Sequence, residues 1–459
     1  MQNENRYLVG LLIFSFLFYL LASQASPIRW WDETIYLNLG ETLSSDAFNY
    51  RFTGYGDYNP VEQWYSAGFR PPLLPYLLAA MSILTGTKAL LFVAVPLLGA
   101  WGIVVIYLLA KEFLGKNALI AAALMGLAPL YVTFSGKVMN DVPATMLMVA
   151  SILAFWKGFE KGETKWKIAA GVFSALAFLM RYTSGMLIFI FGIYIFVRRR
   201  DLLRDKFLYI SAGISLLLLS PLFLYSNSEY GTPLGAIMHG IEASTFWGGT
   251  QPWHFFLNVI PWFSAVAILG ALDMLRHIKD RKAGNKGWLL FIWGAVVLIS
   301  ITLLAHKEER FYLPLLPAFS LLSVASLQRT GKDFRKFALV SVILMIASSL
   351  FFVSAEYWNG YIIHGDENSC FSESMNFAKE NMRKNLPIYS DQSPQVFFYS
   401  GHESPFVPDN LKVPNNSLIL WHSGDKTGGF KDMLEESFEK IYACPEGNEM
   451  YALFRTRET

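Results

Sequence analysis

Eleven apolar stretches, each close to the length needed to cross a bilayer, restrict the fold of this chain more than any other feature. They lie at residues 7–23, 88–110, 117–135, 142–157, 166–180, 183–197, 207–226, 255–275, 288–305, 311–327 and 337–355. A membrane-spanning helix needs about 20 mostly apolar residues. The 459-residue chain is 16% charged, whereas soluble domains carry about 25% charged residues. We therefore predict a mainly α-helical, polytopic membrane protein in contact with membrane lipids.

Lysine and arginine gather in four of the predicted connections between spans, at residues 157–167, 198–206, 276–286 and 329–336. Because basic loops tend to stay in the cytoplasm, the four clusters should share that side. Eleven spans with a cytoplasmic N-terminus satisfy this condition if residues 72–86 do not cross. We therefore expect a multi-pass protein of the cell membrane in which residues 72–86 form a helix in the outer interface.

This topology divides the chain into a transmembrane domain, residues 1–355, and a small extracytoplasmic domain, residues 356–459. The first outer loop, residues 24–87, should carry interfacial helices. Near the C-terminus, "LPIYSD", "SLILWHS" and "MYALFRT" indicate strands and "FKDMLEESFEKIY" indicates an amphipathic helix, so we predict a small α/β domain. Cys370 and Cys444, the only cysteines, lie in it. They form either one disulfide or two buried thiols, and they exclude a multi-cysteine metal site.

Two adjacent carboxylates follow the first span in the stretch "RWWDETIY". Read as a helix, this stretch has an apolar stripe that repeats every four residues from Trp31, which suits a helix at a bilayer surface. Asp32 and Tyr36 form an i, i+4 pair on a neighbouring face. Asp32 and Glu33 can cap the helix and complement its dipole, or they can take part in chemistry.

Further ionisable groups recur at the outer ends of the predicted spans. Arg70 precedes two prolines at the start of a helix, where an arginine can bind an anion or extend to lipid headgroups. Arg181 lies between two spans that are joined by almost no loop. The outer turn 135–146 and the stretch "AHKEERFYLPLLPAF" add Lys137, Asp141, His306, Glu309 and Arg310. None of these groups lies in mid-span, where an ion pathway would place them.

In this order, "WWDETIY", "FRPPLLPYLLA", Asp141, "RYTSG" and "ERFYLPLLPA" resemble the GT-C glycosyltransferases of the protein O-mannosyltransferase and aminoarabinose transferase type. The resemblance covers residues 7–330. It implies a multi-span protein with an outer catalytic face that takes a sugar from a polyprenyl-phosphate carrier and inverts its anomeric centre. The sugar would pass to an acceptor that the motifs do not identify, whether a glycan, a lipid or a protein.

The resemblance also implies roles for individual residues. Asp32 matches the acidic residue of the first loop, a general base or metal ligand, and Glu33 is its partner. We assign the donor phosphate to Arg70, Lys137, Arg181 and Arg310, and the substrate to Tyr36, His306 and Glu309. Phe69 stands where the family commonly has a glutamate, which removes a metal ligand. The arginines would neutralise the donor phosphate either alone or together with a divalent metal ion that bridges Asp32 and Asp141, and we expect no organic cofactor.

Sugar transfer from a lipid phosphate needs a carboxylate to accept a proton and cations to stabilise the departing phosphate. We therefore predict that the acidic pair and the arginines meet in one pocket at the outer membrane face. Two other classes of protein compete with this interpretation. A transporter or lipid flippase would need polar or broken segments near mid-span, and a receptor or scaffold would act through residues 356–459 alone. The net charge of +2 gives no reason to expect a nucleic-acid partner.

Overall fold

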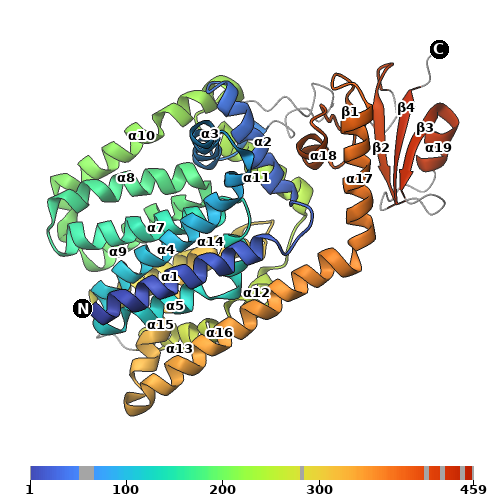
Figure 1. Cartoon of the computed structure of the whole chain (residues 1–459). Coiled ribbons are helices and arrows are strands. Elements are labelled where there is room, and N and C mark those ends of the chain that lie inside the picture. Colours follow the sequence, from blue (N-terminus) through green and yellow to red (C-terminus); the bar gives the residue numbers. More distant parts are fainter. Residues whose placement is uncertain are drawn as a thin grey trace. The chain divides into compact units, whose positions relative to one another are not determined.

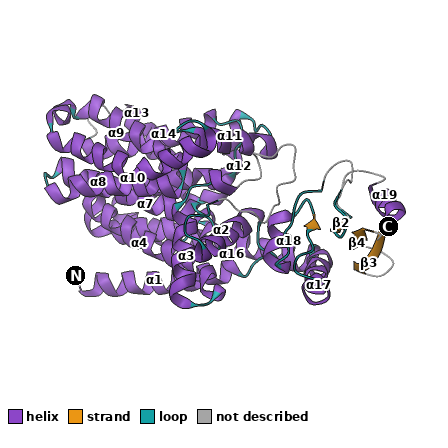
Figure 2. Ribbon diagram, turned by 90° about the horizontal axis from the view of Figure 1, so that it is seen from above, coloured by secondary structure: helices purple, strands orange, loops and turns teal. Residues whose placement is uncertain are grey.

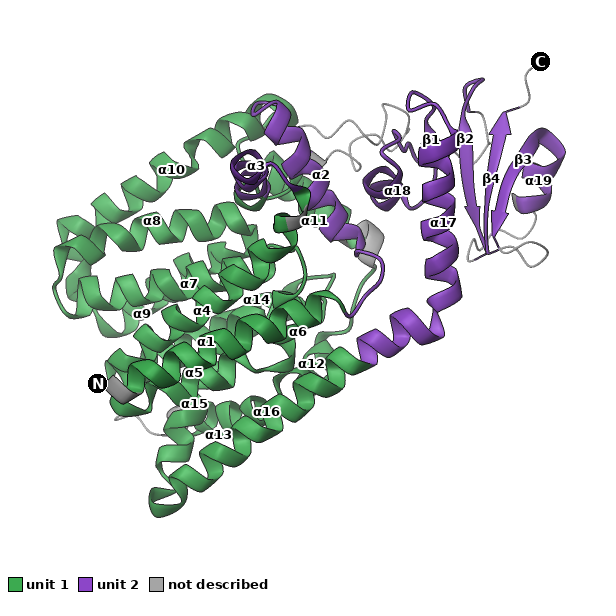
Figure 3. Ribbon diagram, viewed as in Figure 1, with its two compact units in different colours: residues 1–24, 69–74, 88–354 green, residues 25–68, 75–87, 355–459 purple. Residues whose placement is uncertain are grey.

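The computed structural model describes residues 2–50, 67–279, 284–407, 413–423, 430–444 and 450–456 of the chain (Figure 1). Within these residues the chain is mainly helical, and strands occur only near the C-terminus (Figure 2). The chain forms two compact units (Figure 3). Unit 1 comprises residues 1–24, 69–74 and 88–354, and unit 2 comprises residues 25–68, 75–87 and 355–459. Most of the predicted first outer loop therefore groups with the C-terminal residues.

Unit 1 is a helical body. Its α-helices are α1 (Gln2–Ser23), α4 (Leu91–Leu114), α5 (Ala118–Gly126), α6 (Pro129–Ser135), α7 (Asp141–Phe155), α8 (Thr164–Met180), α9 (Met186–Arg198), α10 (Lys206–Tyr230), α11 (Gly235–Gly248), α12 (Phe256–Phe263), α13 (Ala265–Lys279), α14 (Asn285–Leu303), α15 (Leu316–Gln328) and α16 (Phe334–Tyr357), the last of which continues into unit 2. Seven helical stretches of the described residues are long and apolar enough to cross a membrane. The prediction of a mainly α-helical, multi-pass membrane protein is confirmed.

Short 3-10 or π-helical segments extend or connect these helices. They are η1 (Ala67–Phe69), η2 (Lys88–Leu90), η3 (Gly115–Asn117), η4 (Trp156–Glu160), η5 (Tyr182–Gly185), η6 (Arg200–Arg204), η7 (Trp253–Phe255), η8 (Glu309–Leu315), η9 (Gly331–Asp333) and η10 (Trp358–Ile363). In η8, Pro314 keeps the start of the predicted span 311–327 out of the α-helical form, because proline cannot donate a backbone hydrogen bond. Regular α15 therefore begins only at Leu316.

The described residues of the four basic clusters lie at one end of unit 1, as the predicted topology requires. Asn285 donates to Glu160 (Nδ2–Oε2 3.1 Å), and Arg198 donates to Asn285 (Nη2–Oδ1 3.3 Å). These contacts join the clusters at 157–167, 198–206 and 276–286. Arg329, from the fourth cluster, pairs with the buried carboxylate of Asp273 in α13 (Nη1–Oδ1 2.8 Å). We call this region the basic end of unit 1.

Small residues in the part of unit 1 between its two ends allow helices α8 and α10 to pack closely against each other. A Cβ added at Gly171 in α8 would lie 2.3 Å from the carbonyl oxygen of Ser211 in α10. Ser215 of α10 donates a hydrogen bond back to the carbonyl of Gly171 (2.8 Å). Close approach at small residues together with hydroxyl bonds is typical of helix packing within membranes. It holds α8, whose C-terminal end carries a candidate site residue, firmly in place.

Helix α3 (Leu73–Thr85) corresponds to the predicted interfacial helix at residues 72–86. At 1.5 Å per residue its 13 residues are about 20 Å long, which is short of the 30 Å hydrocarbon core of a typical bilayer. This length supports the prediction that the segment does not cross.

Unit 2 contains a small α/β domain and the helix that follows the first span. Its other helices are α2 (Trp31–Ser45), α17 (Gly365–Asn381), α18 (Ser393–Ser400) and α19 (Phe430–Ser437), and its strands are β1 (Ile388–Tyr389), β2 (Leu418–His422), β3 (Phe438–Cys444) and β4 (Tyr451–Thr456). The sheet has the order β1-β2-β4-β3; β1 is parallel to β2, and the other pairs are antiparallel. The predicted small C-terminal α/β domain is present.

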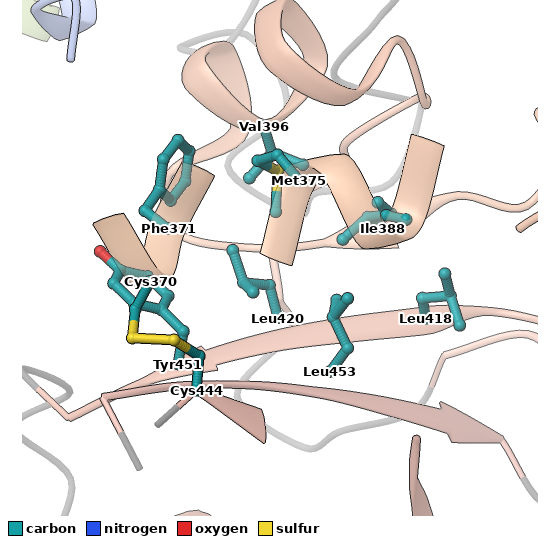
Figure 4. Close-up of a cluster of buried hydrophobic side chains, with 11 residues drawn as sticks. Cys370, Phe371, Met375, Ile388, Val396, Leu418, Leu420, Cys444, Tyr451 and Leu453 are labelled. Atoms are coloured by element: carbon teal, nitrogen blue, oxygen red, sulfur yellow. A yellow bond between two sulfur atoms is a disulfide. The ribbon is translucent and has the colours of Figure 1, made fainter. Parts of the chain in front are cut away.

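The core of this domain lies between α17, α18 and the sheet (Figure 4). Phe371, Val396 and Leu453 are almost completely buried in it. Cys370 of α17 and Cys444 of β3 form a disulfide at its edge (Sγ–Sγ 2.05 Å), which decides between the two alternatives left open for the cysteines.

One sequence prediction for this domain is wrong in part. The stretch "FKDMLEESFEKIY" was predicted to be one amphipathic helix, but α19 ends at Ser437 and the remaining residues belong to β3. Phe438 pairs with Thr456, and Tyr442 pairs with Leu453, across the antiparallel ladder. Strand formation depends on such cross-strand partners more than on local preference, and the periodicity of a single stretch does not reveal them.

Candidate functional site

Asp141, the first residue of α7, has a buried side chain that is 2% exposed. Its carboxylate forms an ion pair with the guanidinium of Arg181, as a buried charge requires. The turn before α7 packs against the end of α1, because a Cβ added at Gly136 would lie 2.7 Å from the backbone nitrogen of Ser23. Glycine permits this approach, which places Asp141 at the end of unit 1 opposite the basic end.

Arg181 follows α8 in an extended conformation (φ −158°, ψ 124°). Its Nη1 donates to Oδ1 of Asn140 (3.0 Å), and its Nε donates to Oγ1 of Thr183 (3.1 Å). Asn140 in turn donates to the carbonyl of Met180 (2.9 Å). Asn140 therefore bridges the start of α7 and the end of α8, and this bridge fixes the guanidinium beside Asp141.

Two guanidinium groups lie against one aromatic ring in this region. The Cζ atoms of Arg181 and Arg310 are 5.0 Å and 5.7 Å from the ring centroid of Phe311, in η8. Nη1 of Arg310 is also 3.6 Å from Sδ of Met139, so η8 contacts the turn before α7. A cation is attracted to the face of an aromatic ring, which helps two like charges share a small volume. We call Arg181, Arg310 and Phe311 the arginine cluster.

Glu308 fixes the second guanidinium of the arginine cluster. Nη2 of Arg310 donates to Oε1 of Glu308 (2.9 Å), and Nε of Arg310 lies 2.6 Å from Oε2 of the same carboxylate in an ion pair. Nε2 of His306 lies 2.9 Å from Oε1 of the same carboxylate. His306 is therefore linked to Arg310 through Glu308, while Glu309, the other predicted carboxylate here, is half-buried.

Two lysines at this end of unit 1 are buried. Lys137 is 1% exposed and Lys307 is 4% exposed. Nζ of Lys307 donates to the carbonyl of Gln251 (3.0 Å) and to that of Leu304. Lys307 thereby ties the segment before η8 to the residues that follow α11. The order of charges in the stretch "AHKEERFYLPLLPAF" does not tell which of these side chains is buried.

Arg70 is connected to the same end of unit 1 through Tyr182, the chain neighbour of Arg181. The hydroxyl of Tyr182 donates to the carbonyl of Arg70 (3.3 Å). The guanidinium of Arg70 lies 5.6 Å from the ring centroid of Phe69, and that ring packs edge-on against the buried imidazole of His239 (5.5 Å). Phe69 therefore lies between the side chains of Arg70 and His239.

The predicted acidic pair lies in unit 2, in the first turn of α2. Glu33 is fully buried; its Oε2 accepts a hydrogen bond from the backbone nitrogen of Trp30 (3.1 Å), and its Oε1 lies 3.7 Å from Nη1 of Arg29. Glu33 thus satisfies a backbone donor at the helix start, as a glutamate three residues after an N-cap often does. Asp32 is half-buried, and Tyr36 is 3% exposed.

The predicted residues fall into two sets. The end of unit 1 opposite the basic end holds Arg70, Lys137, Asp141, Arg181, His306, Glu309 and Arg310, and unit 2 holds Asp32, Glu33 and Tyr36. That both sets share one pocket stays a prediction. Sequence reasoning did not assign site roles to Asn140, Glu308 or Phe311. Phe311 lies inside the motif "ERFYLPLLPA", and Glu308 directly precedes it.

The environment of Asp141 does not suit a divalent cation. Such ions prefer several oxygen ligands, whereas this carboxylate faces a guanidinium. Among the described residues there is no group of three or more His, Cys, Asp or Glu side chains that could hold a metal ion. The predicted metal site on Asp32 and Asp141 joins residues of different units, and we derive no step through it.

Sequence comparison finds glycosyltransferases. The model of the dolichyl-phosphate-mannose-protein mannosyltransferase family matches residues 69–225, the segment that carries Arg70, Asp141 and Arg181. GPI mannosyltransferase 3 of Candida albicans is 26% identical over 212 residues, which is 45% of this chain. The chain spans 41% of the length of that relative.

Comparison with solved structures covers nearly the whole chain. ArnT from Cupriavidus metallidurans is similar in the apo state (TM-score 0.75, 14% identity, 98% of both chains) and bound to undecaprenyl phosphate (TM-score 0.72, 14% identity, 97% of both chains). The chain has the GT-C fold. The Archaeoglobus fulgidus oligosaccharyltransferase also matches (TM-score 0.63, 15% identity, 96% of this chain and 73% of that one). The resemblance to GT-C glycosyltransferases is confirmed.

Proposed function

We propose that this GT-C protein transfers a monosaccharide, with inversion, from a polyprenyl-phosphate donor to an acceptor at the extracytoplasmic membrane face. The arginine cluster carries the proposal, because it holds two guanidinium groups against one ring at a single end of the helical unit. Guanidinium groups bind phosphate with matched, directional hydrogen bonds. A protein of similar fold, ArnT, has been crystallised with undecaprenyl phosphate, which supports this choice of donor.

In the proposed reaction, the arginine cluster and Arg70 hold the donor phosphate. Negative charge accumulates on this phosphate as the bond between its oxygen and the anomeric carbon breaks. Fixed cations in a site with little water stabilise that charge without having to reorganise. Arg181 and Arg310 are fixed in this way, the first by Asn140 and Thr183 and the second by Glu308.

The acceptor hydroxyl oxygen attacks the anomeric carbon from the face opposite the phosphate, which inverts this centre. The polyprenyl phosphate leaves with the bonding electron pair, and the hydroxyl proton passes to a carboxylate. We assign this proton transfer to Asp32 rather than to Glu33, because Glu33 is buried and already serves the start of α2. Positioned general bases contribute about 10²- to 10⁴-fold to the rate.

The phosphate site can be tested without knowing the sugar or the acceptor. Undecaprenyl phosphate in detergent should bind the purified protein, and uncharged undecaprenol of the same length should not. Arg310→Gln should weaken binding of undecaprenyl phosphate about 10- to 100-fold, because a hydrogen bond to a charged group contributes about 1.5–3 kcal/mol. Arg276→Gln, at the basic end, is the matched control. Equal binding of undecaprenyl phosphate and undecaprenol would argue against the proposed site.

Transfer itself can be measured as release of polyprenyl phosphate from polyprenyl-phosphate-mannose in the presence of membranes from the source cells. Other polyprenyl-phosphate sugars would follow if mannose is not released. Activity that persists fully after treatment with a chelator is expected if the arginines alone neutralise the phosphate. Loss of activity that Mg²⁺ or Mn²⁺ restores would instead support the metal site predicted on Asp32 and Asp141.

A further inference from the structure

We infer that the C-terminal α/β domain positions the Asp32 carboxylate by holding the first turn of α2, and that Tyr399 and Gln395 of α18 are positioning residues for the reaction. The inference rests on the role proposed for Asp32. It assigns to residues 393–400 a part in sugar transfer that the motifs near the first span do not indicate.

The backbone just before α2 is held on both sides by α18. The amide nitrogen of Arg29 donates to the hydroxyl of Tyr399 (2.9 Å), and the carbonyl of Arg29 accepts from Nε2 of Gln395 (3.2 Å). Gln395 and Tyr399 are four residues apart, so they lie on one face of α18. Both hydrogen-bonding groups of one main-chain residue, three positions before Asp32, are thus set by side chains of the C-terminal domain.

Glu33 carries this restraint into the helix. Its two carboxylate oxygens face Nη1 of Arg29 (3.7 Å) and the backbone nitrogen of Trp30 (3.1 Å). Glu33 is fully buried, so protein groups rather than solvent surround its carboxylate. Glu33, the residue after Asp32, is therefore tied to Arg29, and through Arg29 to α18.

A second set of contacts fixes the rotation of α2 about its axis. Nδ2 of Asn38, which is 1% exposed, donates to the carbonyl of Pro394 (3.1 Å). Ile35 and Leu39 are buried in a cluster with Phe397. This is the apolar stripe predicted from the sequence, and these members of it pack on protein. The stripe faces α18, so Asp32 lies beside the interface rather than within it.

The opposite side of α2 is held as closely. A Cβ added at Gly40 would lie 2.8 Å from Cβ of Leu78 in α3, so the two helices touch where glycine has no side chain. Restraints on two sides leave α2 little freedom to tilt, and a shift of about 1 Å in a reacting group can cost 10²-fold in rate.

Helix α18 is itself fastened to the core of the domain. Val396 is fully buried against the sheet (Figure 4), and the ring of Tyr399 packs edge-on against Phe371 of α17 (5.7 Å). The disulfide joins Cys370, next to Phe371, to strand β3. The hydroxyl of Tyr399 is thus a fixed point of the folded domain.

The test compares the double variant Tyr399→Phe, Gln395→Ala with the wild type in two measurements. These are kcat and KM for polyprenyl-phosphate-mannose turnover and the binding of undecaprenyl phosphate. We expect kcat to fall about 10-fold, with KM and undecaprenyl phosphate binding within twofold of wild type, because the phosphate contacts belong to unit 1. The matched control is Tyr442→Phe, which removes a hydroxyl 3.5 Å from Glu373 elsewhere in the same domain and should leave kcat unchanged.

An active wild type together with a double variant of unchanged kcat would overturn the positioning inference alone. So would a loss of kcat that the Tyr442→Phe control shares, or one accompanied by an equal loss of undecaprenyl phosphate binding, since either marks general damage. A wild type that turns over no polyprenyl-phosphate sugar overturns the proposed function and, with it, the role of Asp32.

Discussion

The two sets of candidate site residues are built in opposite ways. In unit 1, the groups proposed to bind phosphate come from segments far apart in the chain, and they are held by ion pairs, amides and one aromatic ring at the end of a helical body. In unit 2, the carboxylates sit together on one short helix that is attached to a disulfide-bonded domain. The difference implies that donor binding and proton transfer can be disrupted separately.

The largest expected effect is a loss of turnover without loss of donor binding. Asp32→Asn should lower kcat about 10³-fold, because the amide cannot accept the acceptor's proton. Undecaprenyl phosphate should bind as tightly as to wild type. Glu33→Gln is the matched control: it keeps an oxygen that can accept from Trp30, and its kcat should fall less than tenfold. If Asp32→Asn were folded and fully active, the proposal that Asp32 accepts the proton, and with it the division of roles between the two units, would be wrong.

The second effect concerns stability within unit 1. Arg181→Gln leaves the buried Asp141 carboxylate without its ion-pair partner, and such a loss typically costs about 3–5 kcal/mol. Thermal unfolding in detergent should show it as a lower midpoint. Adding Asp141→Asn should restore most of the stability but not the binding of undecaprenyl phosphate. If the double variant were as unstable as the single one, the ion pair would not be the cause.

A third effect should be confined to unit 2. The double variant Cys370→Ser, Cys444→Ser removes a cross-link between residues 74 positions apart, which typically costs about 2–4 kcal/mol. We expect a lower unfolding midpoint for the C-terminal domain and reduced turnover. Binding of undecaprenyl phosphate should stay at the wild-type level. A parallel loss of lipid binding would show that the two functions are not separable.

The smallest effect is a response to alkaline pH. Burial raises the pKa of Tyr399 above its ordinary value of 10.0, and the pKa of Tyr442 is raised for the same reason. The folded domain therefore retains protons that the unfolded chain releases, so stability is unchanged below pH 10 and falls as the pH rises beyond it. Tyr399→Phe should lessen this fall when unfolding midpoints are compared between pH 8 and pH 11, and an unchanged slope would contradict the assignment.

Local patterns predicted the parts of this structure that depend on neighbours in the chain. The apolar spacing from Trp31 predicted α2, which runs from Trp31 to Ser45, and Pro314 in the sequence accounts for the irregular start of α15. The basic clusters predicted which helix ends lie together. Each of these features follows from periodicity, charge or proline chemistry within a few residues.

Features that depend on distant partners could not be predicted. The ion pair of Asp141 with Arg181 joins residues 40 positions apart, and the sequence of neither segment indicates that the two side chains are partners. The apolar stripe of α2 predicted a helix suited to a bilayer surface, but it did not reveal that Ile35 and Leu39 pack with Phe397, more than 350 residues later. The strand Phe438–Cys444 exists because Tyr451–Thr456 lies beside it. The helical periodicity of a single stretch gives no information about that partner strand.

The attachment of α2 to α18 has a consequence for how the protein is made. The ribosome completes α2 at residue 45 and α18 at residue 400, a difference of 355 residues. At about 5–20 residues per second, translation of this interval takes about 20–70 s. During that time Asn38 and Leu39 lack their partners in α18, Pro394 and Phe397. The membrane helices that lie between α2 and α18 in the chain are inserted in the same interval. The packing of α2 on α18 is therefore a late step of biogenesis. Arrest of translation before residue 400 should leave a membrane-inserted chain in which the residue proposed to accept the proton, Asp32, is not yet held in position.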